Sequence, residues 1–147
     1  MKKKHIRPNT LHSTLMKLHR AHKKRAGYMF KEVNLTEGKP KLLDFLVNNP
    51  GCSQRELAKC CKIEPATATS ILSGMEKEGL IYRERNVNDK RILNVFLTEE
   101  GIKAQKKVEK VFLELDDICF EGFSEEEKLE TIKILNRLYD NLVKHKE

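Results

Sequence analysis

Two helix-start signals lie close together in the middle of the chain. Ser53 and Glu56 form a capping box, in which the Ser53 hydroxyl accepts a hydrogen bond from the backbone N–H of Glu56 and the Glu56 carboxylate accepts one from that of Ser53. Pro65 suits the first turn of another helix, which Gly79 can end in a left-handed conformation. Because only residues 62–64 separate them, the two short helices predict a helix-turn-helix.

A hairpin is predicted directly after this motif. Mainly apolar runs at 80–83 and 92–97, which include Arg83 and Asn94, flank a polar stretch at 86–89, and this is typical of two strands joined by a turn. The pattern predicts a small β wing beside the helix-turn-helix.

Longer helices are predicted on both sides. Apolar residues recur at three- and four-residue spacings over residues 9–33, and Thr98 can cap a long helix after the hairpin. Thr36 is expected to cap a second helix with Pro40 in its first turn, and a capping box that begins at Ser124 starts the last helix. The predicted order is four helices, two strands and two helices.

The charge distribution favours a polyanionic partner. The chain carries 29 Lys+Arg against 22 Asp+Glu, a net charge of +7. Residues 1–35 carry +9, residues 36–97 carry +2 and residues 98–147 carry −4. Nucleic acid is the partner that a basic front and middle stretch predict.

Length and composition limit the protein class. A chain of 147 residues is expected to form one domain, 1–147, too small for the barrel and doubly wound enzyme folds. No apolar run approaches the roughly 18 residues of a membrane span, and basic residues interrupt any signal-peptide pattern, so we expect a cytoplasmic protein without membrane contact. No catalytic motif is found, so an enzyme is not expected.

Metal binding and redox sensing are the alternative means of control. His12, His19 and His22 share a helix face but spread over about 15 Å, too far to reach one ion together. His19 and His22 could bind a metal only with help from another helix. The four cysteines lack zinc spacing and are expected to be small buried thiols, with oxidant sensing as the alternative. No metal or cofactor is predicted.

The second helix of the motif has a face of small polar side chains. At about 100° per residue, Ala68, Leu72 and Met75 share the side that must face the core, and Thr69 and Lys77 lie opposite. Such a face suits a helix in the major groove of double-stranded DNA, although an ordinary solvated surface is the alternative. The residues of the two helices that are expected to contact DNA are Ser53, Gln54, Pro65, Ala66, Thr67, Thr69, Ser70, Ser73 and Lys77.

The hairpin adds four cations to this set. Arg83, Arg85, Lys90 and Arg91 are expected to contact DNA, because arginine on a protruding loop can enter a narrow minor groove. Asp89 is expected to structure the wing instead, by accepting hydrogen bonds from the turn backbone and holding the Arg91 guanidinium.

These segments together resemble a known family. The stretches that carry the resemblance are 35–36, 53–58, 66–69, 75–81, 88–91 and 97–101. They resemble the MarR family of winged-helix transcription regulators, most specifically in the wing with Arg83, Asp89 and Arg91 and in the Leu97-Thr98-x-x-Gly101 run after it. Two positions depart from the family pattern: Lys62 replaces a frequent glycine in the turn, and Ser70 replaces a frequent arginine.

The resemblance implies a fold and an assembly. The fold would be mainly α with a small β-hairpin wing: a winged helix-turn-helix lobe at 36–97, flanked by dimerisation helices at 1–35 and 98–147. The family implies a homodimer, most often a repressor, that binds a pseudo-palindromic operator. The alternative of a different class is a helical interaction protein whose winged module binds another protein.

The resemblance also implies a site of control. A small, often aromatic or phenolic, effector would enter a cleft between the dimerisation helices and the DNA-binding lobe. The residues expected to line it are Leu18, His22, Tyr28, Leu42, Leu43, Val108 and Phe112, all of which fit a dimer core equally well.

Overall fold

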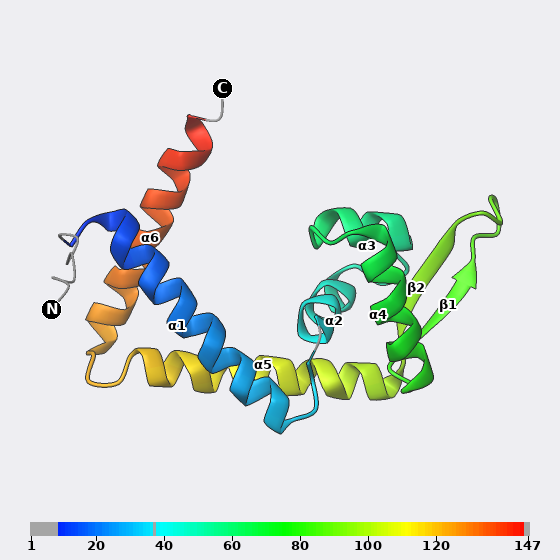
Figure 1. Ribbon diagram of the computed structural model, residues 1–147, viewed down its shortest axis with the longest axis horizontal. Helices are drawn as coiled ribbons and strands as arrows, with labels where there is room; N and C mark the ends of the chain where they lie inside the picture. The colour runs from blue at the N-terminus through cyan, green and yellow to red at the C-terminus, as the bar shows by residue number, and fades with distance from the viewer. Residues whose placement is uncertain (1–8, 37, 146–147) are drawn as a thin grey trace, which may run out of the picture. The chain divides into compact units, whose positions relative to one another are not determined.

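The computed structural model describes residues 9–36 and 38–145. The described part contains six helices and a two-stranded antiparallel sheet (Figure 1). The elements are α1 (Leu11–Glu32), α2 (Lys39–Asn48), α3 (Gln54–Cys60), α4 (Pro65–Lys77), β1 (Ile81–Arg85), β2 (Leu93–Leu97), α5 (Glu99–Cys119) and α6 (Glu125–Lys144). This confirms the predicted order and the winged helix-turn-helix architecture. None of the described helices is long and apolar enough to cross a membrane.

Local side-chain caps start three of the helices as predicted. Ser53 Oγ accepts from the Glu56 backbone N–H at 3.0 Å, and Glu56 Oε2 accepts from the Ser53 N–H at 3.2 Å. The same pair of bonds joins Ser124 and Glu127 at the start of α6. Thr98 Oγ1 accepts from the third residue of α5 at 3.0 Å. Each cap satisfies backbone donors that have no partner within the helix.

The start of α2 differs from the prediction that Thr36 caps it. Gly38 is the residue that precedes α2, with φ +82°, and no side chain caps this helix. Pro40 stands in the first turn of α2, where its missing N–H leaves no backbone donor for a cap to satisfy at that position. The chain therefore enters α2 through a left-handed glycine instead of a polar cap.

The turn between α3 and α4 is tight and left-handed. Lys62 has φ +53°, and the residue after it donates its backbone N–H to the Ala58 carbonyl at 3.0 Å. This is the helix end that glycine usually makes, and a lysine there costs about 1 kcal/mol or more. The departure at Lys62 leaves the fold of the helix-turn-helix intact.

The hairpin is attached to the helix-turn-helix through its second strand. β1 pairs with β2 in the register Ile81↔Leu97 to Arg85↔Leu93. Val95 of β2 also exchanges backbone hydrogen bonds of 2.9 Å with residues 51 and 52, and Asn94 Nδ2 donates to the Gly51 carbonyl at 2.9 Å. The wing is thus held to the segment that leads into α3.

The chain forms two compact units, Met1–Phe112 and Leu113–Glu147, which divide within α5. In the first unit, α2, α3, α4 and the hairpin pack around an apolar core (Figure 1). The most completely buried side chains of that core are Leu42, Leu43, Leu46, Leu57, Leu72, Met75, Ile81, Val95 and Val108. In the second unit, α6 has no buried residue.

Candidate nucleic-acid interface

The N-terminal half of α4 presents small side chains to solvent. Ala68, Leu72 and Met75 are fully buried on the core side of α4. The residues of the predicted DNA-binding set that are exposed on α4 are Pro65, Ala66, Thr67, Thr69, Ser70 and Lys77. Ser73 is half-buried. The first half of α4 therefore offers a ridge of small side chains, three of which carry hydroxyl groups, and this suits close approach to base edges.

Arg83 is placed differently from the exposed contact that its position in the hairpin predicts. Its Nε lies 3.0 Å from Glu76 Oε2, and its side chain is only 16% exposed. Its Nη1 donates to Gln54 Oε1 at 3.3 Å and its Nη2 to Ser73 Oγ at 3.4 Å. Arg83 thus joins β1 to α3 and α4, because a guanidinium can reach three acceptors in one plane.

Glu76 is a site residue that the sequence analysis missed. It accepts from both Nε and Nη2 of Arg83, and this hydrogen-bonded partner holds the pKa of the Glu76 carboxyl below its ordinary value. The two residues are seven positions apart on different elements, so helical spacing alone gives no signal for the pair.

Gln54 and Thr69 form a second link between α3 and α4. Gln54 Nε2 donates to Thr69 Oγ1 at 2.6 Å, and Thr69 Oγ1 donates to the Pro65 carbonyl at 2.9 Å. Two residues predicted to contact DNA therefore contact one another at the surface of the motif.

The wing turn is held by side-chain hydrogen bonds. Asn86 Oδ1 accepts from the backbone N–H groups of residues 88 and 89, and Arg85 Nη1 donates to the Lys90 carbonyl at 2.8 Å. Asp89 accepts from the backbone N–H and the guanidinium of Arg91, each at 3.0 Å. The hydrogen bond from the Arg91 side chain keeps the pKa of Asp89 below its usual value.

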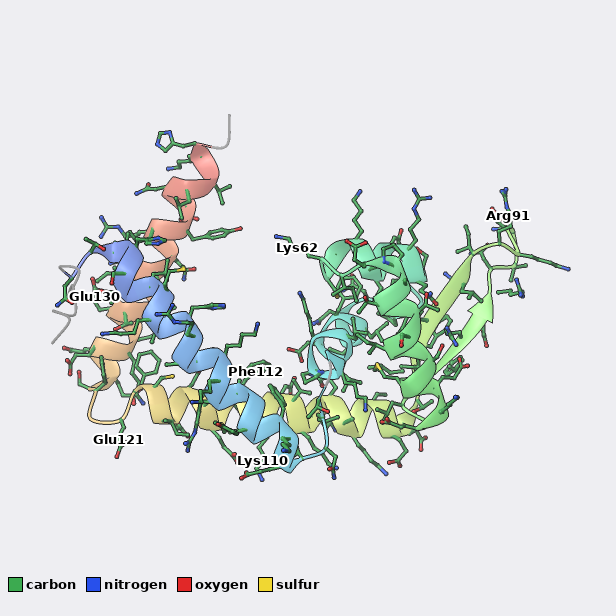
Figure 2. The ribbon with its side chains drawn as sticks, in the orientation of Figure 1. Lys62, Arg91, Lys110, Phe112, Glu121 and Glu130 are labelled. Atoms are coloured by element: carbon green, nitrogen blue, oxygen red, sulfur yellow. The ribbon has the colours of Figure 1, made fainter. Side chains whose placement is uncertain are left out.

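Arg91 is a highly exposed cation of the wing. Its side chain is 90% exposed and lies at the end of the hairpin (Figure 2). The ion pair with Asp89 orients the guanidinium without burying it, so Arg91 stays available to a phosphate or a groove.

A hollow of about 610 Å³ brings the predicted residues of three elements together. Ser53 and Gln54 come from the start of α3, Pro65 from α4, and Asp89 and Arg91 from the wing turn. The hollow therefore joins residues of α3, α4 and the wing turn at one surface.

The predicted effector residues are only partly brought together. A pocket of about 720 Å³ in the first unit is lined by His19, His22, Lys23, Ala26, Gly27, Phe30, Leu35, Thr36, Gly38, Pro40, Lys41, Asp44 and Phe112. His22 and Phe112 were predicted. Leu42, Leu43 and Val108 lie in the core instead, with at most 1% exposure, because α2 and α5 pack their apolar faces together.

The two remaining effector residues lie outside this pocket. Leu18 and Tyr28 are more than half exposed, and Tyr28 lines a separate shallow hollow on α1. The pocket residues His19, His22, Lys23, Ala26 and Phe30 follow helical spacing along one face of α1. That periodicity is a signal from which they could have been found.

The cysteines and histidines form no metal cluster within residues 9–36 and 38–145, where no group of three or more metal-ligating side chains occurs. Burial raises the pKa of Cys52 to about 11 and also raises that of Cys61, so both stay protonated thiols near neutral pH. Cys61 is buried and Cys52 half-buried, whereas Cys60 and Cys119 are exposed, so the expectation of buried thiols is wrong for these last two.

Known proteins share this sequence and this fold. The MarR family model matches residues 35–93. A regulator named BilQ from Clostridium symbiosum is 34% identical over 94 residues, which cover 64% of this chain and 65% of that protein, just under two thirds of its length. The repressor YetL from Bacillus subtilis is 31% identical over 117 residues, which cover 78% of this chain and 70% of YetL.

Solved structures agree. The crystal structure of a MarR transcriptional regulator from Methanosarcina mazei Go1 superposes with a TM-score of 0.77 at 25% identity, covering 91% of this chain and 96% of that one. On the strength of the YetL match and this shared fold, the chain belongs to the MarR family of transcriptional regulators.

Proposed function

We propose that the chain is a homodimeric repressor that binds a pseudo-palindromic operator with α4 in the major groove and the wing beside it. One observation carries the proposal: Pro65, at the start of the exposed small-residue ridge of α4, and the exposed Arg91 line the same hollow. Hydroxyl groups and a guanidinium at one surface match base edges and phosphates. The relatives are named as regulators or a repressor, and the chain is a regulator and not an enzyme.

The lobe at 36–97 supplies the DNA contacts in this proposal, and the helices at 1–35 and 98–147 supply the dimer. Exposed apolar side chains on α6 support a second copy as their partner, because so many exposed apolar groups are unfavourable in water. They are Leu129, Ile132, Ile134, Leu135, Tyr139, Leu142 and Val143. Sedimentation of the full chain tests this: we expect a dimer, and a smaller species for Leu135→Lys. A wild-type monomer at micromolar concentration would contradict it.

The DNA experiment is a gel shift with duplexes from the chain's own upstream region. We expect retardation that survives excess random DNA at moderate salt and a slope of log K against log salt set by the phosphate contacts. Lack of any preference over random DNA would contradict the proposal and favour the alternative, a winged module that binds another protein.

We also propose that a small-molecule effector controls DNA binding. The pocket on α1, α2 and α5 has two aromatic walls, Phe30 and Phe112, and the cations Lys23 and Lys41 at its rim, which fits a small aromatic or phenolic molecule. Binding of this molecule shifts the population of dimers toward a form in which the spacing of the two α4 helices does not match the operator. Linkage then requires that the operator lowers ligand affinity by the same factor.

Titration of salicylate-like compounds into the operator complex tests this control. We expect release of DNA by the wild type, a weaker response in His22→Ala, and an unchanged response in Tyr28→Ala, which lies outside the pocket. An operator affinity that stays constant at millimolar ligand would contradict the effector proposal alone.

A further inference from the structure

Thr69 lies on the exposed ridge of α4, but its hydroxyl is already engaged. Oγ1 donates to the Pro65 carbonyl at 2.9 Å and accepts from Gln54 Nε2 at 2.6 Å. A hydroxyl has one proton to donate. While that proton is bound to Pro65, Thr69 cannot donate a hydrogen bond to a base or a phosphate.

The direction of these hydrogen bonds is fixed by the groups at the ends of the network. Arg83 can only donate, so its Nη1 selects the amide oxygen of Gln54, at 3.3 Å. The Gln54 amide nitrogen must then face Thr69, where it can only donate. Glu76 in turn holds the Arg83 guanidinium at 3.0 Å. The Thr69 oxygen is therefore an acceptor toward Gln54, and its proton is left for Pro65.

Two neighbouring hydroxyl groups on the ridge differ from that of Thr69 in their hydrogen bonding. Among the described residues, Thr67 and Ser70 have exposed side chains and no hydrogen-bond partner for their hydroxyl groups. They remain able to donate or accept at a phosphate or a base edge. Thr69 alone of the three has its hydroxyl proton and one lone pair committed within the protein, so that a single lone pair is all its hydroxyl can offer to DNA.

A threonine whose hydroxyl is committed offers its methyl group to a ligand. The Cβ of Thr69 carries only the hydroxyl, the methyl Cγ2 and a hydrogen. In the major groove, the feature that a methyl complements is the C5-methyl of thymine, which no other base carries. We propose that Thr69 is a specificity-determining residue that recognises one thymine in each half-site by methyl–methyl contact.

This inference rests on the proposed function, because it requires α4 in the major groove. It goes further by naming the base and the chemical group that is recognised. Gln54 and Arg83 act here as positioning residues, since they hold the Thr69 side chain and need not touch the base themselves.

Replacement of single thymines by deoxyuridine is the sharpest probe, because it removes the C5-methyl and changes no hydrogen-bonding group. The DNA is first selected from a random duplex pool with the full chain. Each thymine is then replaced symmetrically in both half-sites. We expect one symmetric position at which the affinity of the wild type falls by about fourfold per half-site, the contribution of a buried methyl-sized group.

Two variants at position 69 distinguish the contribution of the methyl group to recognition from that of the hydroxyl group. Thr69→Ser keeps the hydroxyl and its bonds to Gln54 and Pro65, and we expect it to bind the thymine and uracil duplexes equally. Thr69→Val keeps a methyl and is expected to retain the thymine preference. Ser70→Ala is the matched control on the same ridge and is expected to leave the preference unchanged.

The outcomes distinguish this inference from the proposed function. A chain that selects DNA but is indifferent to uracil at every position overturns this inference alone. A uracil effect that persists in full in Thr69→Ser also overturns it. A chain that selects no DNA overturns the proposed function, and this inference with it.

Discussion

Asp89 and Arg91 form an ion pair across a single intervening residue, with Arg91 Nε 3.0 Å from Asp89 Oδ1 and Nη2 3.0 Å from Oδ2. The two parallel bonds fix the plane of the guanidinium while 90% of the Arg91 side chain remains exposed. Arg83, eight residues earlier, forms its own carboxylate pair but is only 16% exposed. Arg83 and Arg91 therefore have different tasks in the wing.

Arg91→Ala is expected to weaken operator binding by about tenfold per half-site and to make the salt dependence shallower by about one unit of slope. The reason is that an exposed, oriented arginine contacts phosphate or a narrow groove. Fluorescence anisotropy at several salt concentrations measures both quantities. Arg55→Ala, at the start of α3, is the control and should cost less. Equal losses in the two variants would contradict the role of the wing.

Asp89→Asn is expected to weaken binding through a looser wing, with an effect that does not depend on pH near neutrality. The folded pKa of Asp89 is lowered, so the ion pair is complete above the ordinary pKa and is lost only as pH falls through the lowered value. Between about pH 5 and pH 8 both groups stay ionised. The affinity ratio of wild type to variant should be constant over that range, and a ratio that changes there would argue against the pair.

The sequence predicted well where the signal is local. The capping box of Ser53 is contained within four residues, so its chemistry can be read directly. The Arg83 side chain is held by Glu76 and Gln54, which belong to other elements. No rule of sequence spacing predicts that these three residues meet. Thr36 failed as a cap because sequence cannot show that the chain turns through a left-handed residue after it.

The effector residues failed for a related reason. Periodicity shows which side of a helix is apolar, but not whether that side is filled by a neighbour or lines a pocket. Leu42, Leu43 and Val108 are apolar and fully packed, whereas His22 and Phe112 stand at the edge of that packing. Only the placement of α1, α2 and the first part of α5 separates the two groups.

Arg83→Ala is expected to lower the free energy of unfolding by about 1–3 kcal/mol, because it leaves the half-buried acceptors of Gln54 and Ser73, and the exposed Glu76 carboxylate, without their donor. Urea denaturation measures this quantity. Arg85→Ala is the matched control: this arginine is exposed and makes one hydrogen bond, to the Lys90 carbonyl, so we expect a change within about 0.5 kcal/mol. A variant at position 83 as stable as the wild type would show that Arg83 is a surface residue.

Gly101→Ala is expected to destabilise the fold by about 1–3 kcal/mol, because an added Cβ would overlap the Leu80 carbonyl oxygen, which cannot move without the backbone. Gly74→Ala, in the middle of α4, is the control. An added Cβ there meets nothing within 4 Å. Since alanine is the better helix former, we expect a gain of about 0.5–1 kcal/mol. Thermal unfolding followed by circular dichroism compares the two, and equal effects would contradict the close contact at Gly101.

The proposed activity is recognition of a DNA sequence by α4 and the wing of a dimer. Its most direct test is selection of DNA from a random duplex pool by the full chain at moderate salt, followed by sequencing. The account predicts enrichment of an inverted repeat whose half-site centres lie about 34 Å apart, one turn of the duplex. The same selection with Arg91→Ala should recover the repeat with lower yield. A pool that remains random after repeated rounds would contradict the account.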